Sequence, residues 1–257
     1  MIRSTMVAAL LLSGLAVRPV AAGEVRVHYT AYAAGLPVAA IEADWDILPA
    51  AYKVHTSFRT IGALAIAASG KGESTAEGAF NAGRPQPRRF FSQGTFRGEQ
   101  RVTQIDYPGR EPHIRQMVPP QEEERDPVPP AQQAGTVDGL SAVAVLVRQV
   151  NATGRCDGRV ETYDGRRLSE VAAQTGPVQQ LEVTSRSSYN GPALRCDLEG
   201  RMTAGFVRDQ DQTRLRQPTR AIAWFAALAP GGEQVPVRIE IQTRLFSPIM
   251  IYAAAAQ

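Results

Sequence analysis

Residues 24–58 read "EVRVHYTAYAAGLPVAAIEADWDILPAAYKVHTSF", and this stretch decides the fold. Val25, Val27 and Tyr29 alternate with polar neighbours, and the same period of two returns over 51–58. A period of two places successive side chains on opposite faces of a strand that is buried on one side. Glycine and proline separate the runs, so the stretch predicts a three-stranded antiparallel meander.

Strand-like runs of the same kind continue along the chain and predict a mainly β fold. They are GESTAEGAF, RRFFSQGTF, EQRVTQIDY, GRVETYDGRRLSEV, VQQLEVTSRSSY, ALRCDLEGRMTAGFV, VPVRIEIQTRLF and the final IMIYAAA. Asp164-Gly165 is the strongest short hairpin signal among them. Residues 60–69 and 219–229 fit either a helix or a strand. We expect one strongly curved antiparallel sheet, in the form of an open barrel, a β-spiral or a clam.

The segment 108–137 interrupts this series. Seven of the chain's 18 prolines lie in it, together with the acidic cluster Glu122–Glu124. Proline cannot donate to a strand ladder, so we expect a long extended surface loop. It need not separate two domains, and the prediction is a single β-rich domain over 23–257.

The clearest helix signal is "VDGLSAVAVLVRQVNATG" at 137–154. Asp138 can cap the first turn by accepting a hydrogen bond from the amide of Ser141, and Leu140 begins a run that is apolar on nearly all sides. Such a helix must be buried, and we expect it to pack in the concave face of the sheet. The side chains predicted to face a ligand there are Val143, Leu146, Val147, Val150 and Trp45.

The first residues have the features of a secretory signal peptide. Arg3 precedes an apolar run over 6–17, and Val20 and Ala22 are the small residues before a cleavage site that follows Ala22. The run is shorter than the roughly 20 apolar residues that span a membrane. We therefore predict an exported protein with no transmembrane span after cleavage.

The formal net charge of +3 gives little support for a nucleic-acid partner. Arg3 and Arg18 leave with the signal peptide, and acids and bases are then almost balanced. The bases are nearly all arginine, with Lys53 and Lys71 the only lysines. Such a bias, with abundant alanine, is typical of a GC-rich genome rather than of a phosphate-binding design, so we predict no nucleic-acid partner.

The two cysteines, Cys156 and Cys196, have no second cysteine or histidine nearby in sequence. A structural zinc site needs four ligands in close pairs, so we expect no metal and no other cofactor. In an exported chain two cysteines favour a disulfide, the alternative being a free or redox-active pair. The bridge would tie the strand that enters the hairpin at 164–165 to the strand beginning near 193.

No nucleophilic triad is evident in the sequence. A triad needs a serine or cysteine beside a histidine that a carboxylate orients, but His28, His55 and His113 belong to no motif. Ser141 lies in "GLSAV", where Val143 replaces the second glycine of a nucleophile elbow. We assign this serine to the first turn of the helix.

Carboxylates offer the one alternative for catalysis. Glu42, Asp44 and Asp46 would point to the same face of a predicted strand, and Glu122–Glu124 form a second group. Paired carboxylates can hydrolyse glycosides, although a solvated strand face carries such residues without any catalytic role.

The pattern "GRCDGRVETYDGRRLSEV … SYNGPALRCDLEG", preceded by "VDGLSAVAVLVRQV", resembles a family of exported proteobacterial proteins, domain of unknown function 3108. The opening "VHYTAYAAGLPVAAIEADW" also resembles the usual start of that family. The resemblance implies a periplasmic protein whose curved sheet is similar to the β-spiral of envelope-integrity proteins and, more distantly, to the lipoprotein-carrier fold. It carries over no catalytic residue, and it places Cys156 and Cys196 where related envelope proteins have a disulfide.

Together these features predict a non-enzymatic periplasmic protein that supports cell-envelope integrity and holds a lipid or an envelope peptide in an apolar groove. One alternative is an envelope enzyme acting on glycan or lipid through Asp44, Asp46 or Glu122–Glu124. Another is an interaction scaffold that presents exposed sheet edges to protein partners.

Overall fold

The structure is a computed structural model that describes residues 24–208, 210–243 and 247–254. The predicted signal peptide, 1–22, lies outside the described residues. Within the described residues thirteen strands form one antiparallel sheet, which confirms the mainly β prediction. The strands are β1 (Val25–Ala33), β2 (Leu36–Ile47), β3 (Ala51–Thr60), β4 (Gly70–Asn81), β5 (Arg84–Phe96), β6 (Glu99–Asp106), β7 (His113–Val118), β8 (Gly158–Tyr163), β9 (Leu168–Leu181), β10 (Gly191–Ala204), β11 (Thr219–Ala227), β12 (Gln234–Ile241) and β13 (Ile249–Ala253). The helices are α1 (Gly62–Ala67), α2 (Gln121–Glu124), α3 (Pro130–Gln133), α4 (Gly139–Thr153) and α5 (Gln212–Leu215).

The strand order is β7-β6-β5-β4-β3-β2-β1-β13-β12-β11-β10-β9-β8. The first described strand, β1, therefore lies in the middle of the sheet, where its Tyr29 is opposite Ala253 of β13. The chain runs outward to β7, crosses to β8 and returns strand by strand to β13. Because β7 and β8 are the two edges and do not pair with each other, the described sheet is not closed into a barrel.

Three hairpins in the first half of the sheet have two-residue turns. Both turn residues have positive φ at Ala34-Gly35, Ala82-Gly83 and Arg97-Gly98. This is the type I′ geometry, whose twist matches that of the flanking strands. These turns connect β1 to β2, β4 to β5 and β5 to β6.

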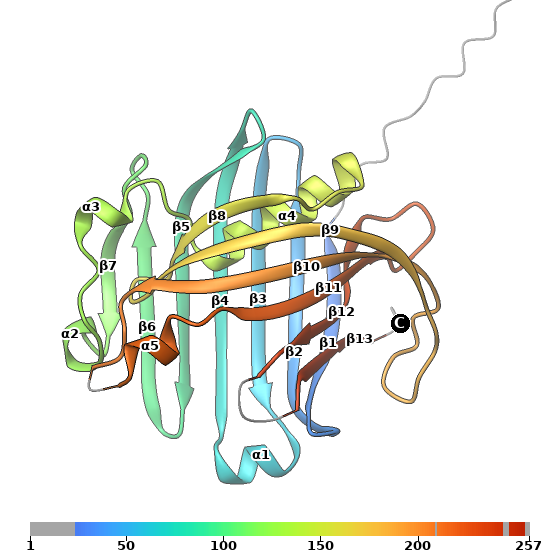
Figure 1. The fold of residues 1–257 in the computed structure, drawn as a ribbon, viewed down its shortest axis with the longest axis horizontal. Coiled ribbons are helices and arrows are strands. Elements are labelled where there is room, and N and C mark those ends of the chain that lie inside the picture. Colours follow the sequence, from blue (N-terminus) through green and yellow to red (C-terminus); the bar gives the residue numbers. More distant parts are fainter. Residues whose placement is uncertain (1–23, 209, 244–246, 255–257) are drawn as a thin grey trace, which may run out of the picture.

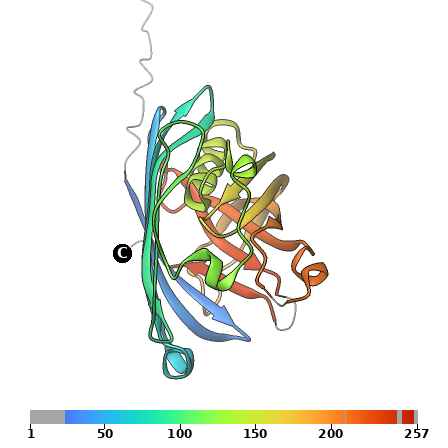
Figure 2. The ribbon, with the colours of Figure 1, turned by 90° about the vertical axis from the view of Figure 1, so that its left-hand side faces the viewer.

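The sheet folds so that its two halves face each other. In Figure 1 the strands β8–β11 cross in front of β2–β6, and Figure 2 shows the halves as two layers with α4 between them. Helix α4 contacts β2–β5 in one half and β8 and β12 in the other. Its residues Ala144, Val147 and Val150 are fully buried in a core to which both halves contribute.

The ends of α4 are as the sequence predicts. The Asp138 carboxylate accepts a hydrogen bond of 2.9 Å from the amide of Ser141, and Gly154 ends the helix in the left-handed conformation. Beyond it, Cys156 and Cys196 form the predicted disulfide, with a Cα–Cα distance of 6.1 Å, and both are fully buried. The bridge fixes the chain just after α4 to β10.

The predicted loop over 108–137 needs a correction, because His113–Val118 form the edge strand β7 and two short helices follow it. The six residues of β7 lie between prolines and keep all their backbone donors, so they can pair with β6. The rest of the segment crosses from β7 to β8. There the Val137 amide donates to the carbonyl of Glu161, and Val137 accepts from the amide of Tyr163.

A charged cluster holds this crossing segment to both halves of the sheet. Glu124 accepts hydrogen bonds from Arg101 of β6 and from Arg166 of the β8–β9 turn. The guanidinium of Arg101 lowers the pKa of the Glu124 carboxyl below its usual value. Arg166 also donates to the carbonyl of Pro119, at 2.6 Å. The cluster therefore joins the two edges of the sheet where strand pairing does not.

Two ambiguous segments and one predicted strand are also settled. Residues 60–69 contain the helix α1, and 219–229 contain the strand β11. The predicted strand "VQQLEVTSRSSY" ends early, because β9 stops at Leu181 and 182–190 form an irregular connection. Among the described residues, no helix has both the length and the apolar character needed to cross a membrane.

We expect the disulfide to contribute about 4 kcal/mol to the free energy of unfolding, because it closes a loop between cysteines 40 positions apart. The double variant Cys156→Ala/Cys196→Ala should lose this contribution in urea denaturation. Adding reductant should weaken the wild-type protein by a similar amount and leave the variant unchanged. Equal stabilities of wild type and variant would contradict the expectation.

Candidate functional site

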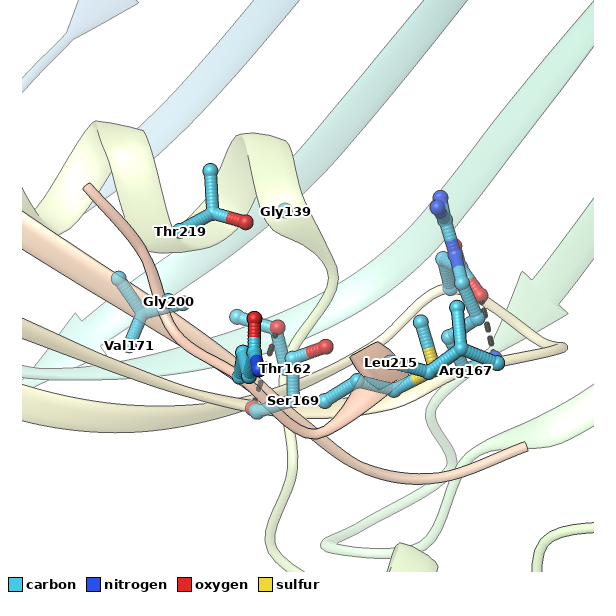
Figure 3. Close-up of a pocket in the computed structure, with 11 residues that line it drawn as sticks. Gly139, Thr162, Arg167, Ser169, Val171, Gly200, Leu215 and Thr219 are labelled. Carbon is cyan, nitrogen blue, oxygen red and sulfur yellow. Dashed lines mark hydrogen bonds and ion pairs between the residues drawn. The ribbon is translucent and has the colours of Figure 1, made fainter. Parts of the chain in front are cut away.

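The described structure has a groove of about 550 Å³ on the inner face of β8–β11, the face turned toward α4. We call it the inner groove, and Figure 3 shows its residues. They are Gly139, Thr162, Asp164, Arg167, Ser169, Val171, Gly200, Met202, Leu215, Gln217 and Thr219. Volumes of roughly 300–1,000 Å³ are typical of small-molecule sites.

Strand register builds the floor of the inner groove in two rows. Ser169 lies opposite Thr162 on one side and Met202 on the other. In the second row Gly200 lies opposite Val171 and Thr219. All these side chains are uncharged, and none is aromatic.

The opposite face of the same strands is charged. Arg159 pairs with Glu170 at 2.8 Å, and Arg220 pairs with Glu199 at 3.4 Å. Because successive residues of a strand point to opposite faces, these ion pairs lie on the outside and leave the inner face uncharged. The alternation in the sequence therefore separates a charged outer face from an uncharged inner one.

The β8–β9 turn closes one end of the inner groove. The predicted hairpin is present, but its loop has four residues, 164–167, because Tyr163 pairs with Leu168. The Asp164 carboxylate accepts hydrogen bonds from the amide of Arg167 and from its guanidinium, both at 2.7 Å. The two charges that line the groove thus neutralise each other. Gly165, with φ of 90°, packs its backbone against β6 and β7.

Hydroxyl groups on the floor of the inner groove can form hydrogen bonds. Thr162 donates a hydrogen bond of 3.3 Å to the carbonyl of Ser169. The side chains of Ser169 and Thr219 have no hydrogen-bond partner within the described ranges. The inner groove can therefore bind an apolar molecule and accept or donate a few hydrogen bonds, but it presents no acid-base pair.

The residues predicted to face a ligand lie elsewhere. Val147, Val150 and Trp45 are buried in the main core, and Val143 and Leu146 pack against it. None of the five lines the inner groove. An apolar stripe on a helix indicates burial, and here the protein core provides it.

As the sequence predicts, Glu42, Asp44 and Asp46 lie on the same face of β2, and Asp46 lies opposite Lys53 of β3. Asp44 accepts a hydrogen bond of 2.6 Å from Arg26 on the outer face, and Glu42 lies 3.5 Å from His28. Glu124 belongs to the charged cluster at the sheet edges, while Glu122 and Glu123 lie at the surface of α2. These acids occupy separate ion pairs or solvent-facing positions.

The three histidines also lie apart. His28 and His113 are exposed on different strands, and His55 hydrogen-bonds to Thr75 at 3.0 Å. Over the described residues, no three metal-ligating side chains gather at one place.

A buried hydrogen-bond chain anchors the start of α4. Tyr52 of β3 donates to the hydroxyl of Ser141, which donates to Asp138, at 2.8 and 2.5 Å. Leu140 packs on the core beside them. Burial raises the pKa of the Asp138 carboxyl above its ordinary value. Because these three side chains are buried, a substrate cannot reach them. Their hydrogen bonds fix the start of α4 to β3, in the first half of the sheet.

Reasoning from the sequence alone missed the inner groove. Its floor consists of small and hydroxyl-bearing residues such as Thr162, Ser169 and Gly200, which carry no motif. The available signal was the uncharged inner phase of "CDLEGRMTAG", in which 196, 198, 200 and 202 alternate with charged residues. The residues of the groove floor come from β8, β9, β10 and β11, and only the register between these strands places them beside one another.

The described residues define a class of protein: a mainly β protein with one open antiparallel sheet of thirteen strands, whose two halves both contact α4. Residues 25–252 match the family described as "Protein of unknown function (DUF3108)", and the chain belongs to this family. The resemblance drawn from the cysteine and helix motifs is therefore confirmed.

Two solved structures are similar to the chain. One is a "Beta-barrel-like Protein of Domain of Unknown Function DUF1849" from Brucella abortus, at 8% identity and a TM-score of 0.48, covering 91% of this chain and 95% of that one. The other is a "putative lipoprotein" from Parabacteroides distasonis, at 10% identity and a TM-score of 0.36, covering 90% and 94%. No curated protein matches the chain in sequence.

The raised pKa of Asp138 predicts a pH dependence of stability. For an acid with a folded pKa above its unfolded value, the stabilisation is present at low pH and is lost as pH rises through the folded pKa. The free energy of unfolding of the wild type, relative to Asp138→Asn, should therefore fall as pH rises above about 4, the ordinary pKa of an aspartate.

Asp157 provides a control of opposite sign. Hydrogen bonds from the amide and hydroxyl of Thr175 lower its pKa, so its stabilisation should be lost as pH falls. Urea denaturation measures both effects, for Asp138→Asn as pH rises above about 4 and for Asp157→Asn as pH falls below about 4. A pH-independent difference between wild type and Asp138→Asn would refute the assignment.

Proposed function

We propose that this protein is a non-enzymatic, exported protein of the cell envelope that holds an acyl chain in the inner groove and so supports envelope integrity. Its predicted signal peptide supports export. The buried disulfide is consistent with export as well, since such bonds persist in oxidising compartments.

The uncharged floor of the inner groove is the observation that carries the ligand proposal. Val171, Met202 and Leu215 supply aliphatic surface, and Gly200 leaves open space between them. Burial of methylene groups against such surface is worth roughly 0.8 kcal/mol each. A chain of methylenes needs no charged partner there, and its head group can meet the hydroxyls or the solvent.

An acyl chain fits this groove better than a peptide does. An extended peptide gains affinity by adding a strand to a sheet edge. The inner groove lies on the face of β8–β11, whose backbone groups already pair with neighbouring strands. In this proposal the curved sheet surrounds α4 on its concave side, and the ligand lies beside the start of the helix.

The non-enzymatic part of the proposal rests on the position of the acids. Asp44 and Glu124 are hydrogen-bonded to arginines, and Asp164 is neutralised by Arg167 at the groove. A glycosidase needs two carboxylates facing one substrate bond. The described groove does not offer such a pair.

A bulky residue at Gly200 should block the ligand. A Cβ at this position meets no atom within 4 Å, so Gly200→Phe would project into the inner groove without a backbone clash. We expect its Kd for a fluorescent C16 fatty acid to rise at least about tenfold, a cost of about 1.4 kcal/mol. Fluorescence titration of the mature protein measures this.

Arg201→Phe is the matched control, because it places the same ring on the outer face one residue further along β10 and should leave the Kd unchanged. Thr219→Glu, which brings a charge into the groove from an exposed position, should weaken binding as Gly200→Phe does. Native mass spectrometry of gently extracted protein should show a lipid adduct. An apo mass together with no fatty-acid uptake by the wild type would overturn the proposal.

A further inference from the structure

A second groove lies on the outer face of the first half of the sheet, across β1–β6, with a volume of about 800 Å³. We call it the outer groove. Its outward-facing side chains are those of His28, Thr30, Ala40, Glu42, Ser57, Arg59, Lys71, Glu73, Gln93, Thr95 and Gln100. Their neighbours Val27 and Tyr29 are buried on the inward side, which places the outer groove on the opposite face of the sheet from α4.

The outer groove has one acidic and one basic row. Glu42 lies opposite Ser57, which lies opposite Glu73. Two residues along the strands, Arg59 lies opposite Lys71. At about 3.3 Å per residue the rows are roughly 7 Å apart.

The basic pair is unusual for this surface. Like charges directly opposite each other on neighbouring strands are destabilising. Neither Arg59 nor Lys71 has an ion-pair or hydrogen-bond partner within the described part of the chain. By contrast, Lys53 on the same face of β3 lies opposite Glu77 and Asp46. A bound anion would relieve the repulsion between Arg59 and Lys71.

Two glycines shape the groove beneath this pair. Gly72 and Gly94 lie opposite each other between the two rows. A Cβ on Gly94 would lie 2.5 Å from the carbonyl oxygen of Lys71, so only glycine permits this close approach of β4 and β5. The position of the backbone at Lys71 in β4 therefore depends on glycine at position 94 of β5.

We propose that the outer groove binds a phosphate group through Arg59 and Lys71, on a small molecule that also carries an ammonium group. The planar guanidinium can bind two phosphate oxygens, and the lysine adds a point charge. In the neighbouring row Glu73 accepts a hydrogen bond from Gln93, and Glu42 lies 3.5 Å from His28. The remaining oxygens of these two carboxylates would accept hydrogen bonds from the ammonium. The ligand class is therefore a phosphorylated zwitterion, and its source is either a free metabolite or a lipid head group.

Titration of the mature protein at low ionic strength tests this inference. Phosphoethanolamine should bind saturably and more tightly than glycerol 3-phosphate or inorganic phosphate, which lack the ammonium. Lys71→Gln and Arg59→Gln should each raise the Kd at least about tenfold, as expected for loss of a charge-assisted contact. Lys53→Gln, the remaining lysine on the same face, should leave the Kd unchanged.

Vesicles that contain phosphatidylethanolamine distinguish the two sources. If the wild type binds these vesicles and Lys71→Gln does not, the ligand is the lipid head group. If the protein binds free phosphoethanolamine but not the vesicles, the ligand is a free metabolite. Thermal unfolding without ligand shows whether a loss of binding comes from a loss of folding. Lys71→Gln should raise the Tm, because it removes the repulsion between Lys71 and Arg59. Absence of saturable binding by every probe, or an equal loss in Lys53→Gln, would overturn the proposal.

Discussion

The burial of α4 between the two halves of the sheet is the contact on which the rest of the structure depends. Ala144, Val147 and Val150 are fully buried, and partly buried apolar residues surround them on the helix. One flat sheet could cover only one side of such a helix, so the thirteen strands must fold back over it. The Asp138 cap and the disulfide at Cys156 fix the two ends of this arrangement.

This constraint also explains why the edges of the sheet stay apart. Helix α4 occupies the space between the halves, and the strands of the two halves cross rather than run side by side (Figure 1). The crossing segment then covers β8 through Val137 and joins Arg101 to Arg166 through Glu124. An uncovered edge would present unpaired backbone groups to other chains. The inner groove remains where the second half of the sheet extends beyond the start of the helix.

The sequence was sufficient for features set by neighbouring residues. These features are the alternation of apolar and polar residues after Val25, the helix cap at Asp138 and the end of the helix at Gly154. Each depends on residues that are close together in the sequence. The sequence did not predict strand β7, because the whole segment 108–137 was judged by its high proline content. The six residues of β7 contain no proline, and six such residues are enough for an edge strand. The inner groove and the pair of Arg59 with Lys71 depend on register between strands, which the spacing of residues in one chain does not determine.

Charge on the outer face specifies that register. Exposed ion pairs such as Arg159–Glu170 contribute little to stability, with a median of about 0–1 kcal/mol. A slip of one residue, however, would turn every outer side chain inward, and would bury those charges against α4. The ion pairs therefore select one register and thereby keep the inner groove uncharged. Within the described strands Arg59 and Lys71 have no opposite charge directly across from them, so no ion pair occupies their side chains, which remain available to a ligand.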